Sequence, residues 1–61
     1  MKVQELINLI AKSGWVEVRQ SGSHKIFKHP NKKETLSIPF HKGKDIPTGT
    51  LSSILKKAGL R

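Results

Sequence analysis

The fold is decided in residues 19–28, which read RQSGSHKIFK. The cluster SGS at positions 21–23 is typical of a hairpin turn, because glycine readily adopts the positive φ that tight turns need. Residues 15–19 precede this turn with an alternating pattern, which places Val16 and Val18 on one side of a strand and Glu17 and Arg19 on the other. Residues 24–28 follow as a second strand, so the stretch predicts an antiparallel hairpin.

The sequence also predicts a helix near each end of the chain. Apolar residues recur with i, i+3, i+4, i+7 spacing over residues 2–13, ended by Gly14, and again after Pro47 and Thr48, ended by Gly59. Between hairpin and second helix we expect a turn at residues 30–33, a third strand at 35–40 and a polar loop at 41–46.

These elements predict a single α+β domain over residues 1–61, with the order α-β-β-β-α. Short connections favour a three-stranded antiparallel sheet with both helices on one face. A core this small gives modest stability, so a binding partner is a candidate stabiliser; a well-packed domain that is stable alone is the alternative.

The alternation of side chains along a strand decides where His24 points. His24 shares a face with Ile26 and Lys28, whereas Phe27 lies on the other face. Phe27 buries more apolar area than Ile26, so we expect Phe27 to face the helices. His24 is then expected on the open face of the sheet or at its edge.

The charge of the chain indicates its class of partner. Twelve Lys and Arg residues against four acidic residues give a formal net charge of +8, which favours nucleic acid or an acidic protein over an ordinary solvated surface. No apolar run approaches the ~20 residues that span a bilayer. Neither predicted helix has the broad apolar face, opposed by a basic face, that a membrane-surface helix needs. The chain contains no cysteine and opens without a signal-peptide pattern, so we expect a cytoplasmic protein with no membrane contact.

His24 is the candidate catalytic residue, because imidazole exchanges protons near neutral pH. Cleaving RNA without a metal requires a base that takes the proton of the ribose 2′-hydroxyl, whose oxygen then attacks the adjacent phosphorus. The alternative for His24 is a structural role at the hairpin or the sheet edge. We expect contacts to RNA phosphate from Ser23, Lys25, Lys28, His41, Lys42 and Lys44.

The basic loop HKGKD at residues 41–45 runs toward a helix N-terminus, as phosphate-binding loops do, although it is not a Walker A motif and an ordinary solvated loop is the alternative. His41, Lys28 and water are all candidates for the proton donor to the leaving group. His24 and His29 fall on opposite faces of a strand, so they do not suit one metal ion, and His29 is expected as a turn residue. We expect neither a metal site nor a cofactor.

Three segments, in order, resemble the HicA family of toxins: GSHKIF at 22–27, IPFHKGK at 38–44, and residues 49–60. The resemblance implies a fold similar to a double-stranded-RNA-binding domain, cleavage of mRNA that arrests translation, and a HicB antitoxin as partner. It implies that His24 carries the catalysis. No DNA contact is expected from the toxin alone. Asp45 stands where the family more often has glutamate, which leaves the Gly-Ser-His motif unchanged.

Two other functions are compatible with part of the sequence. A non-catalytic double-stranded-RNA-binding module shares the topology and charge. Such modules usually carry lysines at the start of the second helix, where this chain has Thr48–Thr50, and the pair Lys56 and Lys57 lies at the other end. A basic protein-binding adaptor accounts for the charge but not for His24.

Overall fold

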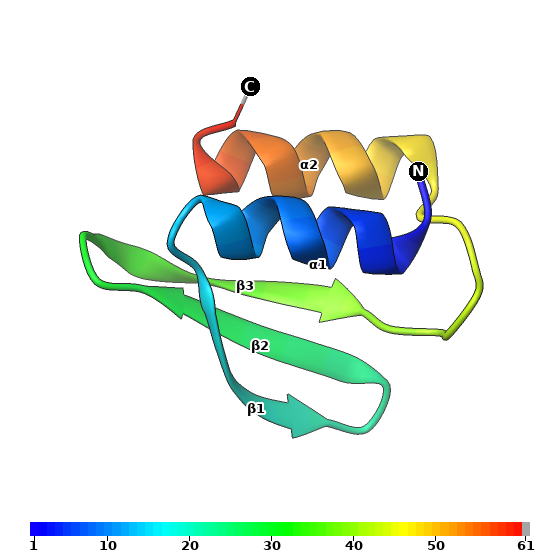
Figure 1. Ribbon diagram of the computed structural model, residues 1–61, viewed down its shortest axis with the longest axis horizontal. Helices are drawn as coiled ribbons and strands as arrows, with labels where there is room; N and C mark the ends of the chain where they lie inside the picture. The colour runs from blue at the N-terminus through cyan, green and yellow to red at the C-terminus, as the bar shows by residue number, and fades with distance from the viewer. Residues whose placement is uncertain (61) are drawn as a thin grey trace.

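The computed structural model describes residues 1–60 and confirms the predicted order of elements. These are α1 (Val3–Lys12), β1 (Val16–Ser21), β2 (His24–His29), β3 (Lys32–Pro39) and α2 (Thr48–Ala58). The strands form one antiparallel sheet in the order β1-β2-β3, and both helices lie over the same face of it (Figure 1). We call the face turned away from the helices the open face.

The hydrophobic core lies between the helices and the sheet. Phe27, on the central strand β2, is only 2 % exposed, which confirms that its side of the strand faces the helices. Burying a side chain of this size stabilises a fold by roughly 1.5–3 kcal/mol. The other buried residues are Val3, Leu6, Ile10, Trp15, Leu36, Ile38, Ile46, Ile54 and Ala58.

Gly22 and Ser23 form a turn of two residues between β1 and β2. Gly22 has a φ of 59°, whereas Ser23 has no positive φ, and this combination is the one required by a type II′ turn. Ser21 pairs with His24 directly across the turn. The carbonyl of Ser23 accepts the Phe40 N–H at 2.6 Å, so the turn is also tied to the chain after β3.

Strand β1 departs from the simple alternation expected from its sequence. Glu17 pairs with Phe27 and Arg19 with Ile26, so Val18 is an extra residue that forms a β-bulge. The expectation that Glu17 and Arg19 share one side of the strand is therefore wrong: Glu17 lies on the helix side, and Arg19 lies on the open face. All residues of β1 are exposed, so backbone pairing rather than burial holds this strand.

Strand β3 begins earlier than expected. The turn before it contains only Pro30–Asn31, and the pairing of His29 with Lys32 extends β3 toward its N-terminus, ahead of the expected start at Thr35. Lys32 and Lys33 carry no apolar periodicity, which is why the sequence pattern did not include them in the strand.

The ends of α2 follow the sequence signals. Gly59 closes the helix with a left-handed φ of 77°, as predicted. At the other end Pro47 is the N-cap residue, and no side-chain hydrogen bond caps the helix. Thr48 is the first residue of the helix.

His29 connects three segments of the fold. Its Nδ1 accepts the Asn31 N–H at 3.0 Å, so the proton is assigned to Nε2, which donates to the Ser13 carbonyl at 3.0 Å. The ring meets the buried Trp15 indole edge-on, with 5.2 Å between centroids. His29 therefore fastens the end of α1 to the β2–β3 turn.

Gly14 offers a test of this packing. Its φ is +99°, and a Cβ at this position would lie 2.8 Å from the Nε2 of His29. We expect Gly14→Ala to lower the free energy of unfolding by about 2 kcal/mol or more, because backbone strain of about 1–2 kcal/mol adds to the clash. Urea denaturation measures this change.

Gly49→Ala is the matched control, because Gly49 lies in α2 with open space around it and no positive φ. Alanine here is expected to raise the unfolding free energy by up to about 0.5–1 kcal/mol. Equal stability of Gly14→Ala and the unmodified protein would contradict the close approach of His29.

Candidate active site

His24 opens the central strand β2, directly after the turn. It is exposed, and it pairs with Ser21 of β1 on one side and Pro39 of β3 on the other. Its face of β2 also carries the half-buried Ile26 and the exposed Lys28, so the imidazole lies on the open face, as expected. Within residues 1–60 no hydrogen bond or ion pair involves this imidazole, which leaves both ring nitrogens available.

Lys25 lies on the opposite side of β2 from His24. Its Nζ is 3.2 Å from Oε2 of Glu17, 3.2 Å from Oε1 of Gln20 and 4.7 Å from the centroid of the Phe40 ring. The side chain is only 18 % exposed. Lys25 thus already has an anionic partner, and the structure does not bring it to the face that carries His24.

Lys28 shares the open face with His24 but lies four positions along the strand. A strand rises about 3.3 Å per residue, so the two Cα atoms are roughly 13 Å apart. Lys28 is therefore placed to contact a neighbouring phosphate of a bound chain, rather than the atoms next to the imidazole.

The loop 41–46 is held at the N-terminus of α1. Val3 N–H donates to the Lys44 carbonyl at 3.1 Å, and Ile46 N–H donates to the Met1 carbonyl at 3.0 Å. Within the loop, the Lys44 N–H bonds to the His41 carbonyl, and Gly43 supplies the positive φ of 78° that the third position of a type II turn requires. The basic side chains of this loop therefore project from an anchored backbone.

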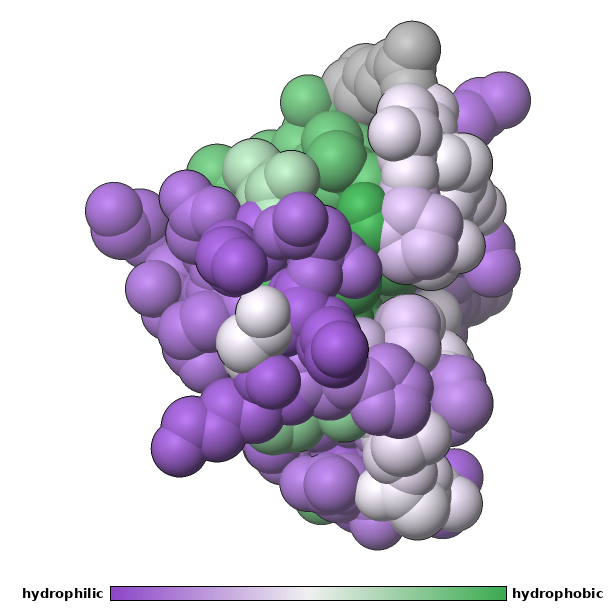
Figure 2. Space-filling model, turned by 90° about the vertical axis from the view of Figure 1, so that its right-hand side faces the viewer, coloured by the Kyte–Doolittle hydropathy of each residue, from purple (hydrophilic) through white to green (hydrophobic). Residues whose placement is uncertain are grey.

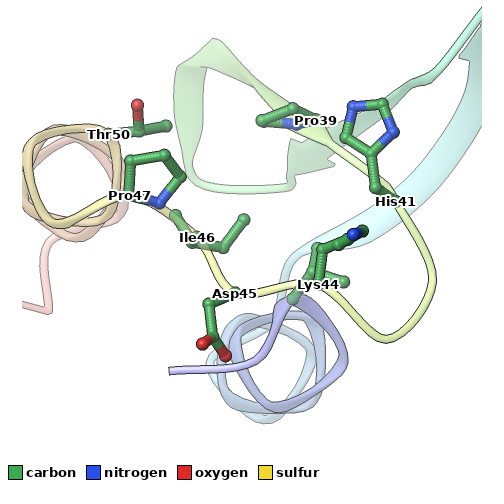
Figure 3. A pocket seen from close by; sticks show the side chains of 8 residues that line it. Pro39, His41, Lys44, Asp45, Ile46, Pro47 and Thr50 are labelled. Atoms are coloured by element: carbon green, nitrogen blue, oxygen red, sulfur yellow. The ribbon is translucent and has the colours of Figure 1, made fainter.

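A cavity of about 400 Å³ lies between this loop, the end of β3 and the first turn of α2. Figure 3 shows His41 beside Pro39 on one side of it, Pro47 and Thr50 on the opposite side, and the Asp45 carboxylate pointing away from the other labelled side chains. The lining residues are Val3, Pro39, His41, Lys44, Asp45, Ile46, Pro47 and Thr50. The cavity thus combines an apolar wall with polar residues of four kinds: His41, Lys44, Asp45 and Thr50.

Pro39 connects this cavity to His24. It pairs with His24 across the sheet and also lines the cavity, and the bond from Phe40 N–H to Ser23 holds the turn against the start of the loop. Of the predicted site residues, the structure therefore gathers Ser23, His24 and the 41–44 loop at one end of the sheet. Figure 2 shows this end of the molecule, where hydrophilic side chains cover most of the surface and hydrophobic ones lie mainly on the helix side.

Sequence reasoning did not include Arg19 among the site residues. The register places it on the open face, opposite Ile26 and diagonal to His24. The signal was present in the length of the turn: a two-residue hairpin turn pairs Ser21 with His24, and counting two residues back along β1 then puts Arg19 on the face of His24. The alternation of valines and charged residues obscured this signal, because it suggests that Arg19 shares a side of the strand with Glu17. The bulge at Val18 places the two on opposite sides.

Residues 1–60 bring together no group of three or more His, Cys, Asp or Glu side chains arranged for a metal ion. His29, which faces the Ser13 carbonyl, lies on the other side of β2 from His24. Neither helix of the described chain has the length and apolar character needed to cross a membrane.

A family model described as "HicA toxin of bacterial toxin-antitoxin" matches residues 3–60 of this chain. The matched span contains both helices, all three strands, the turn before His24 and the 41–46 loop. A comparison with curated proteins finds no match.

The geometry predicts that the two histidines of β2 differ sharply in their effect on stability. We expect His24→Ala to change the free energy of unfolding by less than about 0.5 kcal/mol, because the exposed imidazole has no partner within residues 1–60. His29→Ala should cost about 2 kcal/mol, since it removes two hydrogen bonds and the contact with Trp15. Thermal and urea unfolding of the two variants measure the difference, and comparable losses would contradict these assignments.

Proposed function

This chain belongs to the HicA family of bacterial toxin–antitoxin toxins, and from that premise we propose that it is a metal-independent endoribonuclease that cleaves mRNA and arrests translation. One observation carries the proposal most directly: the imidazole of the Gly-Ser-His segment is exposed on a basic, open sheet face and has no partner within residues 1–60. An imidazole held by structural hydrogen bonds, like that of His29, is not free to accept a proton from a substrate.

In the proposed reaction His24 removes the proton of a ribose 2′-hydroxyl. The 2′-oxygen forms a bond to the adjacent phosphorus, and the bond from phosphorus to the 5′-oxygen of the next nucleotide breaks. The leaving 5′-oxygen takes a proton from a general acid or from water, so the products are a 2′,3′-cyclic phosphate and a 5′-hydroxyl. General base catalysis of this kind contributes about 10²–10⁴-fold.

We assign the general acid to His41 or to water in preference to Lys28. His41 follows the strand end that pairs with His24, whereas Lys28 lies roughly 13 Å along the strand. The cavity between His41 and Pro47 is suited to a flat, apolar group such as a nucleobase next to the cleaved bond.

The proposed phosphate contacts are Ser23, Lys28, His41, Lys42 and Lys44. Lys25, the remaining candidate, contributes only if RNA draws it away from Glu17. Because an exposed polybasic surface binds RNA mainly through its phosphates, these residues supply affinity rather than sequence preference.

The proposed partner that neutralises the toxin is a HicB-like antitoxin. With a formal net charge of +8, the chain attracts an acidic protein surface, and such a surface over His24 and the neighbouring cations would block RNA by occupancy. Binding would also stabilise the folded toxin, whose core is small. We further propose that the toxin acts in the cytoplasm, where mRNA is found.

The decisive experiment is cleavage of an mRNA transcript in EDTA by the unmodified chain and by His24→Ala. We expect the unmodified chain to cut and His24→Ala to cut at least about 10²-fold more slowly, while it stays folded and still binds RNA. His29→Gln serves as the control variant, because it changes the other histidine of β2, which lies on the face away from the proposed site. If both the unmodified chain and His24→Ala bind RNA and neither cuts it, a non-catalytic RNA-binding module is the better account.

Salt dependence distinguishes the two lysines of β2. We expect Lys28→Ala to weaken binding of single-stranded RNA and to reduce the slope of log affinity against log salt by about 0.7, the value for one phosphate contact. Lys25→Met retains the aliphatic stem beside Phe40 and is expected to leave the slope unchanged. An equal reduction in both variants would show that Lys25 leaves Glu17 to bind RNA.

A further inference from the structure

Arg19 lies on the open face of the sheet, in the edge strand β1. It lies directly opposite Ile26, whose neighbours on the same face of β2 are His24 and Lys28. Diagonal neighbours on adjacent strands have Cα atoms about 7–8 Å apart, which a long side chain can span. Arg19 therefore stands between the proposed base and a proposed phosphate contact.

The Arg19 guanidinium has no protein partner within residues 1–60: it is exposed and takes part in no hydrogen bond or ion pair. The bulge at Val18 contributes to this state. In a regular strand Glu17 would point to the same side as Arg19, two positions away. The bulge instead turns Glu17 toward the helix side, where it pairs with Lys25.

No acidic residue stands at a paired position of the open face. The residues paired there are Val16, Arg19, Ser21, His24, Ile26, Lys28, Thr35, Ser37 and Pro39. Two permanent cations and an imidazole thus share a surface with hydroxyl and apolar neighbours, and the cations are left to be neutralised by an anion from solution.

We propose that Arg19 and His24 form a phosphodiester-binding site, in which the Arg19 guanidinium holds the scissile phosphate beside the His24 imidazole. The inference rests on the proposed ribonuclease function and adds to it a second residue that contacts the reacting group. A planar guanidinium donates two parallel N–H bonds to phosphate oxygens, a geometry that a lysine ammonium does not offer.

In this proposal Arg19 stabilises the negative charge of the reacting phosphate and transfers no proton. As the 2′-oxygen bonds to phosphorus and the bond to the 5′-oxygen breaks, negative charge grows on the non-bridging oxygens, and the guanidinium stabilises it. His24 takes the 2′-hydroxyl proton, and the general acid or water supplies one to the 5′-oxygen. Arg19 is thus a catalytic residue distinct from Lys28, which contributes binding.

The test compares single-turnover cleavage of an mRNA transcript with binding of 2′-O-methyl RNA, which lacks the nucleophile. We expect Arg19→Ala to slow cleavage by about 10²–10³-fold and to weaken binding only several-fold. Arg19→Lys should cleave at an intermediate rate. Lys12→Ala removes one positive charge from α1, in the other layer, and is expected to change neither quantity.

Chemical rescue gives a readout that a merely structural role would not produce. Guanidinium chloride at a concentration that does not unfold the protein should restore part of the cleavage by Arg19→Ala and none by His24→Ala. Potassium chloride at equal ionic strength should restore neither.

The proposal is overturned if Arg19→Ala cleaves as fast as Lys12→Ala, or if its loss of cleavage equals its loss of binding. If the unmodified chain does not cleave RNA, the proposed ribonuclease function is wrong, and the binding measurement then tests the phosphate site independently. In that case, weaker binding of 2′-O-methyl RNA by Arg19→Ala than by Lys12→Ala supports the phosphate site, and equal binding overturns it.

Discussion

The two-residue turn at Gly22–Ser23 is the constraint on which both the fold and the candidate site depend. It sets the pairing of Ser21 with His24, and the side chains of β2 then alternate between core and open face. A slip of one residue would move Phe27 out of the core and turn His24 into it. Loss of the buried ring would be costly, so the packing that stabilises the domain also holds His24 on the accessible face.

The basic character of the open face arises from where the acids are placed as much as from the number of lysines. Glu17 is turned to the helix side and pairs with Lys25, and Asp45 and Glu5 both interact with Lys2 at the start of α1. Glu5 accepts the backbone N–H of Lys2, and Glu34 lies where β3 shifts register against β2, so none of the four acids stands at a paired position on the face of His24. Because electrostatic attraction to phosphate depends on local charge, this segregation matters more for RNA binding than the net charge does.

Much of the fold could be predicted from the sequence, since helical periodicity, glycine positions and strand alternation are local properties. The bulge at Val18 could not, because the alternation of valines and charged residues looks the same with or without an inserted residue. The role of His29 was also hidden, because its partner Ser13 and its neighbour Trp15 belong to the segment before β1. The site was predicted at His24 and the 41–44 loop, whereas the place of Arg19 depended on register.

The amino-acid sequence alone reveals the order of the elements, the burial of Phe27, the excess of positive charge and the resemblance carried by the Gly-Ser-His segment. These follow from residue type and spacing along the chain. The tertiary structure added the bulge that turns Glu17 to the helix side, where it pairs with Lys25, and the hydrogen bonds that hold the 41–46 loop beside the turn. A bulge and long-range backbone hydrogen bonds set these positions, and neither is encoded in local periodicity.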